Sequence, residues 1–219
     1  GANTAVGYQA LFANTAGNQN TAVGHQTLFA NTTGINNGAF GRFALFSNTT
    51  GGSNTANGQR GLYSNTTGSD NTAIGIQSLD ANISGSQNNA IGKFSMYTNT
   101  TGAGNNAFGY RAGYGNSTTV DQRSVIDNYM TFIGYQASRD ASIASTTALT
   151  NGIAIGKNAR VAGSNMMVLG GTGSDAVNVA IGTTSPWAKL SIQNTFGSLT
   201  PLFDIASSTS VAYATTSIF

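Results

Sequence analysis

The glycine-rich segment at residues 167–175 has the spacing that comes nearest to a chemical site. Its order, Met-Val-Leu-Gly-Gly-Thr-Gly-Ser-Asp, has the pattern of a strand that enters a dinucleotide-binding loop. Such a loop needs a following helix to hold the pyrophosphate, whereas residues 176–182 predict another strand. The segment also fits one copy of a calcium-binding nonapeptide, with Asp175 and backbone carbonyls as oxygen ligands. Because only one copy occurs, we favour a plain glycine-rich corner and predict no cofactor and no metal.

Catalytic side chains have no better candidate elsewhere. His25 is the only histidine, and it occupies a variable position of the repeat described below, where a catalytic base would not be placed. The chain contains no Gly-x-Ser-x-Gly elbow and no phosphate-binding loop, and its seven acidic residues are dispersed rather than paired. We therefore predict no catalytic residues and a protein that is not an enzyme.

The composition narrows the class of protein further. Only 7% of the 219 residues are charged, 39% are hydrophobic, and there is no cysteine. The net charge of +2 comes from single scattered residues, which argues against a nucleic-acid partner. No run of 18 apolar residues occurs, so we predict no membrane-spanning segment. The chain opens at Gly1 without a Met or a signal-peptide pattern, so we expect a mature or excised piece.

An internal repeat of seventeen residues dominates the first half of the chain. Asparagine recurs at this spacing from Asn3 to Asn105, each time opening a block such as Asn-Thr-Ala-Val-Gly. The glycine that ends the block is present in every unit: Gly7, Gly24, Gly41, Gly58, Gly75, Gly92 and Gly109. A unit of this length is too short for a helix pair but suits one coil of a β-solenoid, with two short strands and two glycine corners.

Stacked coils would place identical residues above one another as ladders. We expect two apolar inner rows, one of Leu or Met beginning at Leu11 and one of Val, Ile or Phe beginning at Val6. The asparagines would form amide ladders along the axis: Asn14, Asn31, Asn48, Asn65, Asn82 and Asn99. An aromatic row follows the leucines, and we expect it at a subunit interface or inside the coil: Phe12, Phe29, Phe46, Tyr63, Tyr97 and Tyr114.

Two other readings of these columns stay open. Asn31, Asn48, Asn65, Asn82, Asn99 and Asn116 each begin a glycosylation sequon, although Asn14 holds the same place without one, which favours the ladder. The threonine column could order water on an ice-binding face: Thr15, Thr32, Thr49, Thr66 and Thr100.

The strict period ends near residue 116, which divides the chain into four predicted parts. Residues 1–116 form the regular solenoid, 117–130 an insertion or transition, and 131–182 irregular coils with a shared apolar-apolar-Gly ending. Residues 183–219 predict a turn and a strand that lead toward a further C-terminal region.

These repeats resemble two groups of fibrous proteins. The blocks Asn151-Gly-Ile-Ala-Ile-Gly156 and Asn178-Val-Ala-Ile-Gly182 are similar to the head repeats of trimeric autotransporter adhesins. That resemblance implies a left-handed parallel β-roll built by three chains. The run Ile181-Gly-Thr-Thr-Ser-Pro-Trp-Ala-Lys-Leu-Ser-Ile192 is similar to a segment of phage tail fibres and bacterial surface fibres.

The sequence thus predicts an all-β parallel β-solenoid of seventeen-residue coils, like a left-handed β-roll, trimeric and rod-shaped. We expect a structural segment of an extracellular fibre at a cell or virion surface, such as an adhesin shaft or tail fibre. Its partners would be copies of itself, as a homotrimer or an end-to-end filament. A head that binds a receptor or glycan is the alternative, and an ice-binding solenoid is a third reading.

Overall fold

The protein is described by a computed structural model that covers residues 2–114, 126–143, 147–177, 179–181 and 190–192. The chain divides into two compact units, Gly1–Ala176 and Val177–Phe219. The first unit is a parallel β-solenoid, so the predicted all-β solenoid class is confirmed.

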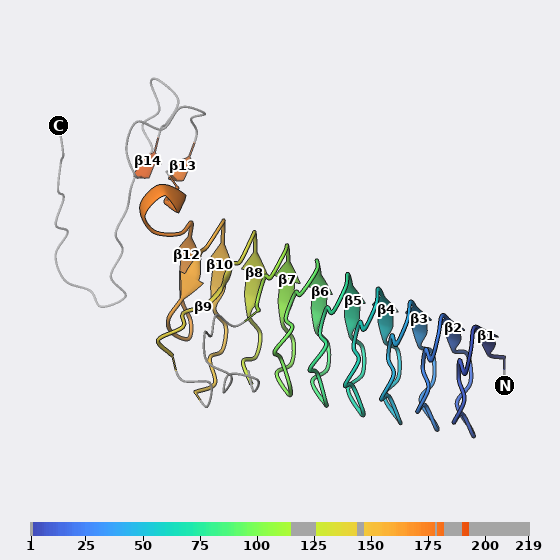
Figure 1. Ribbon diagram of the computed structural model, residues 1–219. Coiled ribbons are helices and arrows are strands. Elements are labelled where there is room, and N and C mark those ends of the chain that lie inside the picture. The colour runs from blue at the N-terminus through green and yellow to red at the C-terminus, as the bar shows by residue number, and fades with distance from the viewer. Residues whose placement is uncertain (1, 115–125, 144–146, 178, 182–189, 193–219) are drawn as a thin grey trace, which may run out of the picture. The chain divides into compact units, whose positions relative to one another are not determined.

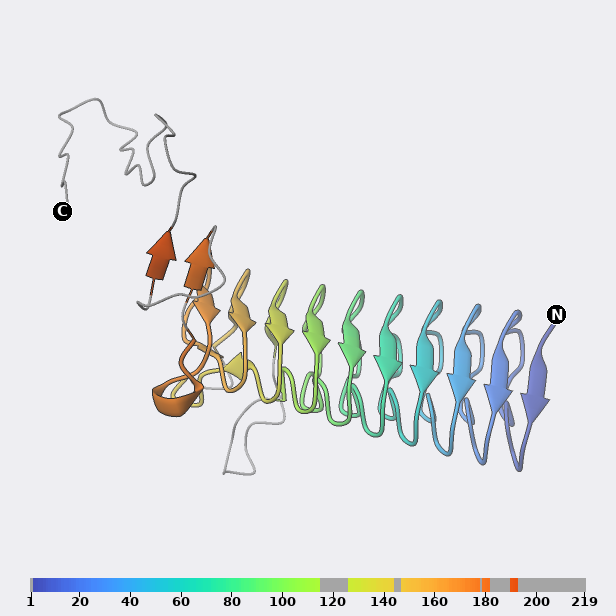
Figure 2. The ribbon, with the colours of Figure 1, turned by 90° about the horizontal axis from the view of Figure 1, so that it is seen from above.

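Each coil of the first unit contributes one three-residue strand to a single parallel sheet (Figures 1 and 2). The ten strands, in their order across the sheet, are β1 Thr4–Val6, β2 Thr21–Val23, β3 Gly38–Phe40, β4 Thr55–Asn57, β5 Thr72–Ile74, β6 Asn89–Ile91, β7 Asn106–Phe108, β8 Thr131–Ile133, β10 Ile153–Ile155 and β12 Met167–Leu169. From β1 to β7 the paired residues are seventeen apart, as in Thr4 with Thr21. The spacing then changes, with Asn106 pairing Thr131 and Ile153 pairing Met167.

The remaining elements are short. Strand β9, Ser138–Arg139, pairs in parallel with β11, Arg160–Val161, on the later coils. A 3-10 turn, Gly173–Asp175, follows β12. In the second unit, β13 Val179–Ile181 pairs in parallel with β14 Leu190–Ile192.

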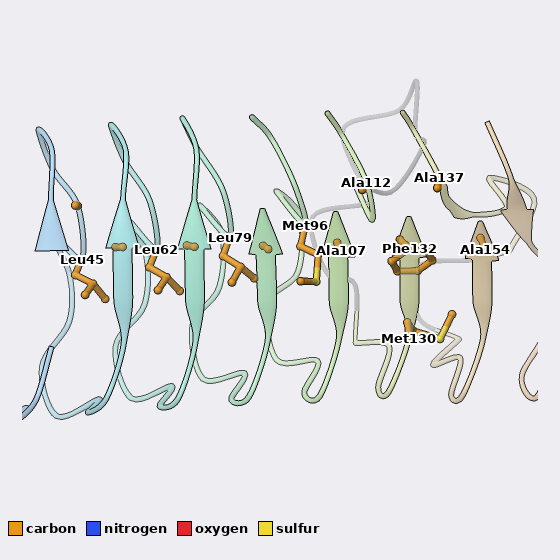
Figure 3. Packing of buried hydrophobic residues seen from close by; sticks show 14 of the residues in the cluster. Leu45, Leu62, Leu79, Met96, Ala107, Ala112, Met130, Phe132, Ala137 and Ala154 are labelled. Atoms are coloured by element: carbon orange, nitrogen blue, oxygen red, sulfur yellow. The ribbon is translucent and has the colours of Figure 1, made fainter. Parts of the chain in front are cut away.

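The core consists of a row of small side chains that faces a row of large ones along the stack (Figure 3). The middle residue of each regular strand is an alanine that points inward, and from β2 to β7 it is fully buried. Opposite it lies the Leu and Met row, which is buried as expected: Leu28, Leu45, Leu62, Leu79 and Met96.

The second predicted inner row is wrong. Side chains alternate along a strand, so when alanine points inward its neighbours must point outward. Phe40, Ile74 and Phe108 are accordingly exposed rather than buried. Only a methyl group fits between the sheet and the facing leucine in so flat a coil.

The predicted second strand of each regular coil is also absent from residues 2–114. The chain there makes turns in which alternate residues have left-handed backbone angles, such as Gln26 at φ 52° and Leu28 at φ 50°. Non-glycine residues adopt this conformation at a cost of about 1 kcal/mol each. Neighbouring coils still bond backbone to backbone, as from Leu28 N–H to Ala44 O at 3.0 Å, so the stacking bonds offset this strain.

Glycine is required at the first corner because the next coil lies directly against it. Gly24 has φ +140°, and a Cβ there would lie 2.7 Å from the carbonyl oxygen of Gly41. A side chain would therefore break both the turn and the stacking of the coils.

Candidate functional site

The asparagines from Asn14 to Asn99 form a hydrogen-bonded ladder through the regular coils. The Nδ2 of Asn48 donates to Asn31 Oδ1 at 2.8 Å and to Gly51 O at 2.9 Å. Asn65 repeats the pattern by donating to Asn48 Oδ1 at 2.8 Å. From Asn31 to Asn99 these side chains are buried. A buried amide nitrogen that already donates two hydrogen bonds is not accessible to a glycosyltransferase in the folded chain. The ladder therefore accounts for the sequons from Asn31 to Asn99. Asn116 lies outside the described residues.

A second asparagine ladder runs beside the first and shares its acceptors. Asn20 Oδ1 accepts from the backbone N–H of Asn37 at 2.9 Å, and Asn20 Nδ2 donates to Gly34 O at 2.8 Å. Gly34 O also accepts from Asn31 Nδ2 at 3.1 Å. The two ladders therefore meet at one glycine carbonyl in each coil, a junction that the repeat pattern alone does not reveal.

The threonine column next to the corner also bonds from coil to coil. The Oγ1 of Thr32 donates to Thr49 O at 3.0 Å, and that of Thr49 donates to Thr66 O at 3.0 Å. Each of these hydroxyls uses its single donor on the neighbouring coil. The hydroxyl protons of this column are therefore engaged within the protein, and the ice-binding reading stays a prediction.

The outer surface of the ten-stranded sheet, called the sheet face below, carries an apolar row. It consists of the last residue of each strand, and Phe40, Ile74, Ile91 and Phe108 are 38–42% exposed. Asn57 is the polar member of this row. The sequence alone gives no reason for it, but an outward position tolerates a polar residue without burying it.

The aromatic row forms a stack on the surface of the coil. Phe29 and Phe46 lie 5.1 Å apart at the ring centroids, with an interplanar angle of 6°. Tyr97 and Tyr114 continue the stack at 5.4 Å. These rings are half-buried and lie outside the core, so the expectation of a coil interior is wrong, while the expected subunit interface stays a prediction.

Asp80 takes the place of an aromatic residue in this row and forms an ion pair with a neighbouring arginine. The guanidinium of Arg60 donates to both Asp80 carboxylate oxygens, at 2.8 and 3.0 Å, and lies 4.1 Å from the centroid of Tyr63. The hydrogen bond to Asp80 raises the pKa of Arg60. His25 is exposed, stacks on Tyr8 at 5.3 Å, and has no catalytic neighbour among the residues described.

The glycine-rich corner near Asp175 is occupied by the protein's own donors. Lys157 Nζ lies 2.7 Å from Asp175 Oδ1, and Asn158 Nδ2 donates to Oδ2 at 2.6 Å. The bond from Lys157 holds the pKa of Asp175 below its usual value. No group of three metal-ligating side chains occurs within the described part of the chain. Asp175 is thus paired with two neighbouring donors, and a plain corner without metal stays a prediction.

A buried ion pair, which the sequence did not indicate, fastens the irregular coils. Arg139 Nη1 donates to Asp127 Oδ1 at 2.9 Å, and both side chains are almost fully buried. Leu149 N–H donates to the same oxygen at 2.8 Å. Burial raises the pKa of Asp127 despite these partners. Arg139 occupies the aromatic position of its coil and Asp127 the position of a corner glycine, so only the register of the irregular coils could have brought them together.

Comparisons with known proteins gave no match. No protein-family model, no curated protein and no solved structure matches the chain. Among the described residues, no helix is long and apolar enough to cross a membrane.

Proposed function

We propose that this chain is a structural segment of an extracellular fibre, assembled from copies of itself and without catalytic activity. The residues that recur along the regular coils make contacts along the stacking axis: asparagine amides, threonine hydroxyls and stacked rings. Stability in such an array is nearly a sum of coil and interface terms, so the fold lengthens by duplication. At about 4.8 Å per coil, the stack would act as a stiff rod.

The observation that carries the proposal is the exposed apolar row on the sheet face. Single exposed apolar residues are common, but a contiguous line of them marks an interaction surface. The row runs along the regular coils, with Ile74, Ile91 and Phe108 each at least 38% exposed. Copies that pack side by side along this row would bury it over its whole length. The resemblance to trimeric adhesin heads favours three copies around one axis.

The test replaces apolar residues of the sheet face by the residue that the repeat itself tolerates there. Asn57 occupies this row in β4, so the variant Ile74→Asn/Ile91→Asn/Phe108→Asn keeps a side chain that the fold accepts. Each substitution removes about 1 kcal/mol of apolar burial from the assembly. Together they should raise the dissociation constant roughly a hundredfold, measured by sedimentation velocity.

A matched control changes exposed apolar residues elsewhere. The variant Ile76→Gln/Ile83→Thr/Tyr110→Gln also uses residues that the repeat places at those positions, and it leaves the sheet face intact. It should assemble like the wild type. Equal weakening in both variants would show that the sheet face is not the contact surface.

A further inference from the structure

Two clusters of cations and aromatic rings repeat on the surface that follows the first glycine corner. The first contains Arg42, Phe43, Arg60 and Tyr63. The second is its copy three coils later, in which position 42 becomes 93 and position 60 becomes 111: Lys93, Phe94, Arg111 and Tyr114. We call the surface that bears both clusters the cation–aromatic face.

Each cluster holds its cations against ring faces. The guanidinium carbon of Arg42 lies 4.4 Å from the Phe43 centroid, and Lys93 Nζ lies 5.0 Å from that of Phe94. Arg111 is bordered by three rings, of which Tyr114 is nearest at 4.9 Å. These contacts orient the cations while leaving their charge uncompensated.

The two clusters differ in how their charges are balanced. In the first cluster, the Asp80 carboxylate accepts two hydrogen bonds from Arg60 and balances its charge. In the second, neither Lys93 nor Arg111 forms an ion pair with any residue that the structure describes, and the same holds for Arg42. Arg111 Nε is buried and has no hydrogen-bond acceptor in the described chain. The second cluster therefore carries two positive charges that have no anionic partner among the described residues.

The orientation of the rings indicates what this partner is. Cations lie over the ring faces of Phe43 and Phe94. The other two rings of the clusters stack on the rings beside them, Tyr63 on Phe46 at 9° and Tyr114 on Tyr97 at 15°. Ring edges carry partial positive charge and so attract anions. Bases of single-stranded nucleic acid need open ring faces on which to stack, and these faces are covered.

We propose that the cation–aromatic face binds an acidic polysaccharide. Its carboxylate or sulfate groups would pair with Arg111 and Lys93 in one cluster and with Arg42 in the other, about 14 Å away at three coil spacings. Equivalent clusters in line suit a linear polymer whose anionic groups recur. This binding activity goes beyond the proposed structural role and does not depend on it.

The test removes one charge from the face without disturbing the coil. In the variant Arg111→Gln, glutamine enters a position that Gln77 already fills, with φ 55° against 54° for Arg111. The control Asn36→Asp lowers the net charge equally but lies at another corner, where Asp70 holds the equivalent place. Binding is measured by calorimetry with dextran sulfate, polygalacturonate, neutral dextran and single-stranded DNA.

We expect dextran sulfate or polygalacturonate to bind the wild type and the control alike, and Arg111→Gln to bind roughly tenfold more weakly. The tighter of the two acidic probes distinguishes sulfate from carboxylate recognition. Equal weakening by the control, binding of neutral dextran with the same affinity, or no binding at all would overturn the proposal. Tighter binding of DNA would overturn the assignment to polysaccharides. Sedimentation of the same samples reports assembly separately, so failure of one proposal is distinguished from failure of the other.

Discussion

The regular coils at residues 2–114 and the irregular coils at residues 126–176 belong to one sheet but are held together differently. In the regular coils, each buried asparagine bonds to its equivalent seventeen residues away. In the first irregular coil, Met130 takes the place of the second-ladder asparagine and Phe132 that of the inward alanine, which returns as Ala154 in the next coil. Apolar packing and the Asp127–Arg139 pair complete that part of the core.

This difference explains why one region keeps a strict period and the other does not. A ladder of amides needs every donor opposite its acceptor, so an inserted residue leaves buried polar groups unpaired, each at a cost of about 1–3 kcal/mol. Packing of Met and Phe is not directional and tolerates coils of different length. The spacings beyond β7, such as 131 to 153 and 153 to 167, follow the loss of the ladder.

The largest expected effect comes from putting a charge into the ladder of the regular coils. In Asn65→Asp, a buried carboxylate would face the Asn48 Oδ1 atom, to which Asn65 Nδ2 now donates. The unpaired buried charge should lower the free energy of unfolding by about 4 kcal/mol, measured by urea denaturation. Asn36→Asp, on an exposed corner, should change it by less than about 0.5 kcal/mol. Similar losses at both positions would mean that the ladder does not set the stability of these coils.

An intermediate effect is expected where the regular core meets the irregular one. Gly113 holds the place of the core leucine, and a Cβ there would lie 2.9 Å from Phe132 Cδ2. Phe132→Ala should cost about 3 kcal/mol through the cavity that it leaves. The double variant Phe132→Ala/Gly113→Leu restores the alanine and leucine of a regular coil.

A double-mutant cycle measures how far the two positions compensate. The double variant should be more stable than the sum of the single changes by roughly 1–2 kcal/mol. The alternative substitution Gly113→Ala, whose clash Phe132→Ala also relieves but which does not fill the cavity, should show a smaller coupling than Gly113→Leu. If the changes in the free energy of unfolding simply add, Phe132 does not fill the space that Gly113 leaves on the opposite side of the core.

The smallest expected effect is a pH dependence of the free energy of unfolding, which arises from a buried carboxyl group in the irregular coils. Burial raises the pKa of Asp127, so folding favours its protonated form. The contribution of Asp127 to the free energy of unfolding therefore falls as the pH rises from the pKa of the unfolded chain, near 4, through the higher pKa of the folded protein. Relative to Asp127→Asn, the wild type should gain stability on acidification across this window. A loss over the same window, seen in urea denaturation at matched ionic strength, would contradict the assignment.

The sequence was a good guide wherever a residue's role depends on its equivalents in neighbouring coils. The Asn14 to Asn99 column and the buried leucines follow from the period alone, because stacking brings equal residues together. The inward alanines were missed, because hydrophobicity pointed to the larger Val6 row and did not reveal how narrow the coil is. The Asp127–Arg139 pair had no periodic signal at all, since its two residues replace a glycine and an aromatic ring.

The solution mass of the wild-type chain tests the proposed assembly most directly. Multi-angle light scattering over a dilution series should give about 67 kDa, three times the 22.3 kDa of one chain, or larger end-to-end multiples. A mass that stays at 22.3 kDa at every concentration would contradict the proposal, because the sheet face would then remain uncovered in solution.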